Sequence, residues 1–424
     1  MKKLMIKKIA IVLLCACLIL PLFSINLVKV SAIPDQPKKL DVYFVAGQSN
    51  AAGTTYYKRD LRQYALGVDY VVNLTDRTLV TEYEAGYNNV YYCGYSGDGG
   101  TKGGGRTHSI KITKAGLGIS ELHIGPELGM AISLQEKYAN SNNDALILKY
   151  AVGASSLDGK AGCRWGNWCP PSKVATSTVH GENLYYNMVG HAENGYTDGA
   201  IYQYLTDAIN SSIYANGGYG AIDFKGLVWL QGEAESSAED RAKAYGEYLM
   251  ALINDFRADA VEIANAFSGD HGVNITSNVN LPFVVSEIAP TFGGALWFEE
   301  IGSNNSYINT IIKRERRVAE LMKNVVTIDT THYVIKQEYS TFYSLAEGSY
   351  TMDKWHYNAD DMIEIGVKAG NFFATGYFDE KPDINTSSNS GCASMIETKS
   401  SIILSLVALI LAGVVISLKR ENLR

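Results

Sequence analysis

Residues 40–50 are Leu40-Asp41-Val42-Tyr43-Phe44-Val45-Ala46-Gly47-Gln48-Ser49-Asn50, a run of strand-forming residues that ends at a glycine and small polar side chains. Short apolar runs of this kind are typical of parallel strands buried on both faces, so residues 40–46 predict a strand. Similar runs occur at 145–152, 226–230, 282–288 and 325–330. We therefore expect several parallel strands in one sheet.

Helical patterns lie between these runs, over residues 126–138, 238–264, 307–323 and 359–375. Ser236 and Ser237 precede the second pattern and Asn358 precedes the last, and such residues commonly cap helix N-termini. The alternation of strands and helices predicts a doubly wound α/β sheet in one domain.

One segment does not follow this alternation. Residues 54–120 are rich in Tyr and Gly. We expect them to form a long insertion on the face where the strands end, where the insertion would shape a binding site.

The composition excludes several classes of protein. The chain has 424 residues, of which 46% are hydrophobic and 19% charged, which is too apolar for a disordered protein. The formal net charge is −7 and no long basic run occurs, so we expect no nucleic-acid partner. The seven His are scattered and no Cys-x-x-Cys pair occurs, so we expect neither a metal site nor a cofactor.

The N-terminal end resembles a secretory signal. Lys2, Lys3, Lys7 and Lys8 precede an apolar run, and small residues end at Ala32, so we expect cleavage after residue 32. Removing residues 1–32 removes five Lys and no acids, which lowers the net charge from −7 to −12. An uncleaved N-terminal anchor and a lipoprotein are the alternatives.

The C-terminal end carries a second apolar run. We expect residues 33–379 to form the folded domain, 380–400 a polar stalk, 401–418 a transmembrane helix and 419–424 a basic cytoplasmic tail. The domain would then be held outside the cell, at its surface. A buried core helix is the alternative for the apolar run. In an exported domain, a disulfide between Cys163 and Cys169 is possible and stays open, as does the fate of Cys392.

Polar residues with catalytic potential lie at three predicted strand ends or turns. Ser49 follows the first strand, in the position of a nucleophile or of a helix cap. Gln231 ends another strand and has two N–H donors, which suit an oxyanion or a structural hydrogen bond. Asp353 and His356 are three residues apart, so the carboxylate could orient the imidazole, unless they are a surface pair.

These features together resemble the SGNH hydrolase superfamily, and more closely its carbohydrate-esterase branch, which contains sialate O-acetylesterases and acetylxylan esterases. The blocks that carry the resemblance are Gly47-Gln48-Ser49-Asn50, Trp229 with Gln231-Gly232-Glu233, and Asp353 with His356. The resemblance implies a flavodoxin-like, three-layer α/β/α sandwich with a central parallel sheet.

The resemblance also implies roles for individual residues. Ser49 would be the nucleophile, His356 the base and Asp353 the acid that orients it. The oxyanion would be held by the N–H groups of Ser49 and Gly153 and by the side chain of Gln231. Ala154 stands where the branch has a second glycine, so whether Gly153 or Ala154 donates its N–H stays open. Supporting positions would be Gln48, Asn50 and Glu233.

The implied activity is removal of acetyl groups from sugar hydroxyls through an acyl-enzyme. The substrate would be an acetylated carbohydrate of the sialic acid or xylan type. Trp165 and Trp168 could stack on sugar rings or pack inside the domain, and Arg164 could pair with a sugar carboxylate. The sequence leaves open which glycan is used and how many copies assemble. The alternative function is a surface glycan-binding protein on an esterase fold.

Overall fold

The computed structural model describes residues 38–56, 58–60, 70–72, 87, 89–98, 101–111, 117–119, 123–139, 141–159, 165–174, 182–210, 219–290, 306–331, 333, 341–344, 349–352 and 356–375. The chain divides into two units, Met1–Asp379 and Glu380–Arg424, and every described residue belongs to the first. The predicted signal, stalk, membrane helix and basic tail lie outside the described residues. Within the described ranges, no helix is both long enough and apolar enough to span a bilayer.

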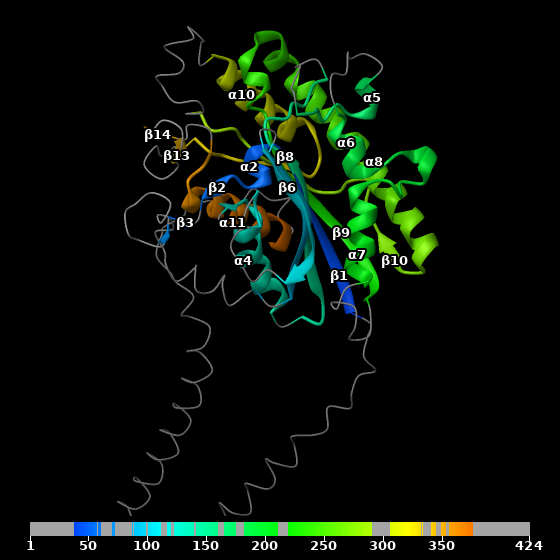
Figure 1. Cartoon of the computed structure of the whole chain (residues 1–424). Helices are drawn as coiled ribbons and strands as arrows, with labels where there is room; N and C mark the ends of the chain where they lie inside the picture. The colour runs from blue at the N-terminus through cyan, green and yellow to red at the C-terminus, as the bar shows by residue number, and fades with distance from the viewer. Residues whose placement is uncertain are drawn as a thin grey trace, which may run out of the picture. The chain divides into compact units, whose positions relative to one another are not determined.

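A single large sheet forms the centre of the domain (Figure 1). Its strand order is β12 (Val325–Ile328), β11 (Phe283–Ser286), β9 (Tyr219–Leu230), β1 (Lys38–Gly47), β8 (Asp144–Val152), β5 (Val90–Asp98) and β6 (Thr101–Lys111), and β10 (Asn274–Thr276) pairs with β9. Neighbouring strands are parallel, apart from the antiparallel pair β5 and β6. The predicted parallel sheet is confirmed.

Helices cover both faces of the sheet. Figure 1 shows α4 (Glu127–Tyr138) and α11 (Ala359–Thr375) on one side and α6 (Leu184–Val189), α7 (Ala200–Asn210) and α8 (Glu239–His271) on the other. α10 (Ser306–Leu321) packs with α8. Short elements connect these layers: α2 (Ser49–Ala52), α5 (Pro171–Val174), η2 (Ala192–Asn194), η3 (Glu235–Ser237), and the strand pairs β2 (Thr55–Tyr56) with β7 (His123–Ile124), β3 (Lys58–Asp60) with β4 (Tyr70–Val72), and β13 (Thr341–Ser344) with β14 (Ser349–Met352).

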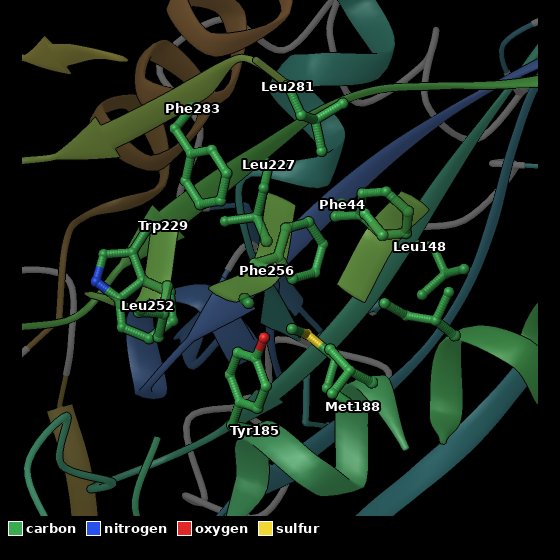
Figure 2. Packing of buried hydrophobic residues seen from close by; sticks show 14 of the residues in the cluster. Phe44, Leu148, Tyr185, Met188, Leu227, Trp229, Leu252, Phe256, Leu281 and Phe283 are labelled. Carbon is green, nitrogen blue, oxygen red and sulfur yellow. The ribbon is translucent and has the colours of Figure 1, made fainter. Parts of the chain in front are cut away.

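Strand β1 contributes to two cores because its side chains alternate between faces. Phe44 points into the cluster beneath α8, whereas Tyr43 and Val45 join the cluster beneath α4 and α11. In the first cluster the rings of Phe44 and Phe256 meet edge to face with centroids 5.4 Å apart (Figure 2). Burial on both faces is what makes the central strand a continuous apolar run.

Two glycines let α4 and α11 approach closely. A Cβ added at Gly129 would lie 2.0 Å from the carbonyl oxygen of Ile363, and one added at Gly366 would lie 2.1 Å from that of Pro126. α11 begins three residues after His356, so this contact fixes the chain that carries the imidazole.

The structure corrects two expectations about elements. Residues 90–98 and 101–111 are sheet strands, although we expected the whole of 54–120 to be an insertion outside the alternation. Tyr87 and Tyr92 of that segment are buried in the core. Ser236 and Ser237 make no capping hydrogen bond to α8. The expected cap of α11 is confirmed, because Asn358 Oδ1 accepts the Asp361 N–H at 2.8 Å.

Candidate active site

The first strand ends in a turn that only glycine can begin. Gly47 has φ +138°, and a Cβ there would lie 2.1 Å from the Leu230 carbonyl oxygen of β9. The next N–H, that of Gln48, donates to the same oxygen at 2.9 Å. Ser49 is half-buried and begins the one-turn helix α2 directly above the ends of β1 and β9.

The loop after β8 lies on the other side of β1. The Gly153 N–H donates to the Gly97 carbonyl oxygen at 2.8 Å, so its predicted donation to an oxyanion would require this hydrogen bond to break. Ala154 is exposed and has φ +54°, which is unusual for a residue with a Cβ. No described residue accepts a hydrogen bond from the Ala154 N–H.

Gln231 follows β9 and joins two loops. Its Nε2 donates to the Ser155 carbonyl oxygen at 3.3 Å and to Glu235 Oε2 at 2.5 Å. A Gln amide has two N–H donors, so both are engaged. The predicted donation from Gln231 to an oxyanion therefore requires a different orientation of the amide than the structure has.

Glu235 is a member of the site that the sequence did not indicate. Its Oε1 accepts the N–H groups of Leu157 at 2.5 Å and Asp158 at 3.3 Å, while Oε2 holds Gln231. Burial raises the pKa of Glu235 to about 7, although these hydrogen bonds oppose the shift. The carboxyl group thus ties the loop after β8 to the end of β9.

Asn50 brings the late part of the chain to the first turn. Its Nδ2 donates to Glu233 Oε1 at 2.9 Å, and its Oδ1 accepts the Tyr357 N–H at 3.4 Å. The Thr55 hydroxyl also donates to the Tyr357 carbonyl oxygen, at 2.9 Å. Residues separated by about 300 positions are therefore joined beside Ser49.

His356 precedes Tyr357 and is buried. Burial raises the pKa of Glu233, while the hydrogen bond from Asn50 and the charge of nearby His356 act in the opposite direction. The second oxygen of Glu233 is buried and has no hydrogen-bond partner among the described residues. The structure thus brings together the segments of Ser49, Glu233 and His356. Asp353 lies outside the described residues.

Further acidic groups lie behind Glu233. Glu315 of α10 is fully buried and accepts the Ile288 N–H at 3.3 Å. Burial, strengthened by the neighbouring Glu287, raises the pKa of Glu315 well above its usual range. Glu287 is held by two hydrogen bonds from Arg316, at 2.9 and 2.7 Å.

The two tryptophans of the predicted sugar-binding loop differ in exposure. Trp168 is fully buried, donates to Ser155 Oγ at 2.9 Å and meets Trp229 edge to face, so of the two roles that the sequence left open it has the one of packing inside the domain. Trp165 is 37% exposed. The next residue, Gly166, accepts the Ser156 N–H at 3.3 Å, which puts Trp165 beside the loop after β8. Arg164 and Cys163 lie outside the described residues.

Comparison with known protein families gives a match over much of the chain. The model of a family described as "Carbohydrate esterase, sialic acid-specific acetylesterase" matches residues 108–374, which is more than half of the chain. The matched range includes Gln231, Glu233 and His356, whereas Ser49 precedes it. No curated protein matches the chain.

The solved structures that this chain is similar to have low sequence identity to it. A protein from Arabidopsis thaliana is 15% identical, with 80% of this chain and 99% of that one covered and a TM-score of 0.43. NanS is 14% identical, with 80% and 97% covered and a TM-score of 0.43. A carbohydrate acetylesterase from Xanthomonas citri is 14% identical, with 79% and 56% covered and a TM-score of 0.42.

Proposed function

The chain belongs to the sialic acid-specific acetylesterase family of carbohydrate esterases, and we propose that it removes acetyl groups from sugar hydroxyls through an acyl-enzyme on Ser49. The observation that carries this proposal is the pair of hydrogen bonds made by Asn50. They join the Ser49 turn to Glu233 and to the backbone beside His356. These bonds bring the segment of His356 beside that of Ser49, and a serine with a neighbouring imidazole is the core of a serine-hydrolase site.

The reaction follows from this arrangement. Ser49 Oγ attacks the ester carbonyl carbon while His356 takes the hydroxyl proton. The tetrahedral intermediate collapses as His356 returns the proton to the sugar oxygen, which leaves. Water then attacks the acetyl-serine carbonyl with His356 again as base, and His356 returns this proton to Ser49 Oγ as acetate leaves.

Two backbone N–H groups suit the oxyanion. One is the N–H of Ser49, at the start of α2, and the other is that of Ala154. The Ala154 N–H takes the role first expected of Gly153, because the latter is bonded to Gly97. Each donor of this kind contributes about 100- to 1000-fold to turnover.

Two carboxyl groups are candidates for orienting His356. The family resemblance points to Asp353. Glu233 is supported by its burial and by the electrostatic effect of His356 on its pKa. We assign the acid to Asp353 and propose that Glu233, fixed by Asn50, supports the imidazolium formed during the reaction.

The proposed substrate is an acetylated glycan of the sialic acid or xylan type outside the cell. Trp165 supports this choice, because an exposed indole beside the loop after β8 offers a face for a sugar ring. Export and surface attachment are proposed from the two apolar ends of the sequence alone.

Hydrolysis of 4-nitrophenyl acetate tests the enzyme assignment. We expect Ser49→Ala and His356→Ala to lose at least about 1000-fold in kcat/KM while keeping the wild-type circular dichroism spectrum. The matched controls are Ser268→Ala and His191→Ala, because Ser268 lies beside β10, which pairs with the first half of β9, and His191 is exposed and pairs with Asp198. Turnover by Ser49→Ala equal to that of the wild type would refute the role of Ser49.

A panel of acetylated xylan, sialoglycan, pectin and peptidoglycan tests the substrate class. We expect acetate release from at least one of these polymers, and loss of that release in Ser49→Ala. Binding to a glycan without acetate release from any of them would favour the alternative, a surface glycan-binding protein.

A further inference from the structure

A buried lysine lies beneath the turn that carries Ser49. Lys149 is in the middle of β8 and is fully buried. Its ammonium donates to the carbonyl oxygens of Ala52 and Leu117, both at 3.1 Å, and to Glu127 Oε2 at 3.0 Å. The ammonium also lies 5.3 Å from the centre of the Tyr92 ring. All three of its N–H donors are therefore used.

Stability alone does not explain this ion pair. Taking two charges out of water is costly, and buried pairs can often be replaced by apolar residues without loss of stability. Burial indeed lowers the pKa of Lys149, and Glu127 only partly opposes this effect. The pair does, however, reach backbone carbonyls on two separate segments. Its geometry suits a role in fixing those segments.

One of those segments is the nucleophile turn. α2 has only four residues, and a single helical turn is not stable by itself. Its internal hydrogen bonds run from the Ala52 N–H to the Gln48 oxygen, at 2.7 Å, and from the Gly53 N–H to the Ser49 oxygen, at 2.9 Å. The carbonyl of Ala52, at the end of the turn, is bound by Lys149. A cation at this C-terminal end also interacts favourably with the dipole of the turn, whose positive end lies at the Ser49 N–H.

Glu127 anchors the lysine from the other side. Its Oε2 contacts the ammonium, and its Oε1 accepts the Gly125 N–H at 2.9 Å, at the start of α4. A Cβ at Gly125 would meet the Ala51 carbonyl oxygen at 3.1 Å, so this segment also packs on the Ser49 turn.

We propose that Lys149, held by Glu127, is a positioning residue that fixes the one-turn helix carrying Ser49. The catalytic consequence of this inference rests on the proposed function, whereas the fixing of the turn by Lys149 does not. Lys149 is fully buried, and its three hydrogen bonds go to Ala52, Leu117 and Glu127 rather than to Ser49. By holding the Ala52 carbonyl, Lys149 fixes the position of the Ser49 hydroxyl and N–H.

A second buried cation provides a matched control. Arg257 of α8 donates to the carbonyl oxygens of Leu281, at 2.9 Å, and of Lys323, at 2.8 Å. It therefore also links separate segments through backbone carbonyls. These segments precede β11 and β12, at the opposite ends of the strands from Ser49.

Hydrogen exchange tests the structural part of the proposal. Lys149→Met alone would leave Glu127 buried without its cation, so the informative variant is Lys149→Met/Glu127→Gln. We expect the amides of residues 49–53 to exchange at least about tenfold faster in this full-length variant, and at the wild-type rate in Arg257→Met. Unchanged exchange at residues 49–53 would overturn the proposal.

Kinetics test the catalytic part. With 4-nitrophenyl acetate, we expect kcat of the folded double variant to fall by about 10- to 100-fold while KM changes less than twofold, because a small displacement of a nucleophile slows chemistry more than binding. Arg257→Met should keep the wild-type kcat. A wild-type kcat in the double variant, or an equal loss in Arg257→Met, would overturn the positioning role. Absence of turnover in the wild type would instead refute the proposed function, and hydrogen exchange would still decide whether Lys149 holds the turn.

Discussion

Buried carboxyl groups concentrate around the strand ends of this domain. Burial raises the pKa of Glu233, Glu235 and Glu315 above the usual range of glutamic acid. A buried carboxylate is costly unless N–H or O–H donors surround it. Glu235 accepts three N–H donors, yet burial still raises its pKa to about 7, which places its ionisation within the physiological range.

Glu235 should make stability depend on pH. Its pKa of about 7 in the folded protein exceeds the ordinary value of 4.5, so between these values the folded state binds more protons than the unfolded state. The stabilising contribution is therefore complete below about pH 4.5 and is lost as the pH rises through about 7. From pH 5 to 8 we expect the free energy of unfolding to fall by about 2–3 kcal/mol more in the wild type than in Glu235→Gln.

Urea unfolding at a series of pH values measures this difference. Glu320→Gln is the matched control, because Glu320 is exposed and paired with Arg317. The control should have the same pH dependence as the wild type. If Glu235→Gln also had the wild-type slope, the carboxyl of Glu235 would not titrate in this range.

At the residue scale, the sequence predicted the polar motifs but not the buried charges. Ser49 and His356 stand in recognisable blocks of small and polar residues. Lys149 lies between Leu148 and Tyr150, and nothing local indicates that its ammonium is enclosed. Trp165 and Trp168 share one loop, yet Trp165 is exposed whereas Trp168 is fully buried with its indole N–H bonded to Ser155 Oγ. Burial of this kind is set by tertiary contacts, which a single sequence does not contain.

At the element scale, the contact between α4 and α11 positions the segment of His356. Gly366→Ala would bring a methyl group to 2.1 Å from the Pro126 carbonyl oxygen, so one helix must move. We expect a loss of about 1–3 kcal/mol in the free energy of unfolding, as is typical of overpacking. We also expect kcat for 4-nitrophenyl acetate to fall, because α11 begins three residues after His356.

Gly269→Ala is the matched control for this substitution. Gly269 lies in α8, and a Cβ there would meet nothing within 4 Å. Replacing a helical glycine by alanine in open space should raise stability by about 0.5–1 kcal/mol and leave kcat unchanged. Thermal unfolding and the same kinetic assay measure both effects. A fully active and stable Gly366→Ala would show that the two helices can separate without moving His356.

Elements with a continuous apolar or amphipathic pattern were predicted well. The expected bounds of α11 coincide with those observed, and β8 and β12 differ by one or two residues at their ends. β5 was missed because its Tyr- and Gly-rich sequence lacks such a run. Gly94 of β5 is required by packing, since a Cβ there would lie 2.7 Å from the Lys149 carbonyl oxygen. A close approach between strands therefore removed the signal that would have identified the strand.

At the scale of the whole molecule, the strand order explains why the site forms where it does. β1 lies between β8 and β9, so the chain leaves β1 toward one side of the sheet and later crosses to the other. In doubly wound sheets a crevice opens at the carboxyl ends of the strands where the connections diverge in this way. Ser49, Ala154 and Gln231 follow the three strands at that point. Topology thus assembles the site, and the later segment of His356 is added to it through Asn50.

The two ends of the chain predict that this domain works at a membrane surface. Residues 402–418 are apolar or small and are followed by Lys419 and Arg420. A span of this length reaches only the lower limit for crossing a bilayer, so deleting it tests whether it anchors the domain.

We expect the full chain to remain in the membrane pellet after a carbonate wash, and a variant lacking residues 401–424 to be released. Intact cells carrying the full chain should hydrolyse an acetylated polymer that cannot cross membranes, because the positive-inside rule places residues 33–379 outside. A variant lacking only 419–424 is the control and should stay in the pellet. Recovery of the full chain in the soluble fraction would contradict the anchor, whereas activity that requires cell lysis would contradict the orientation.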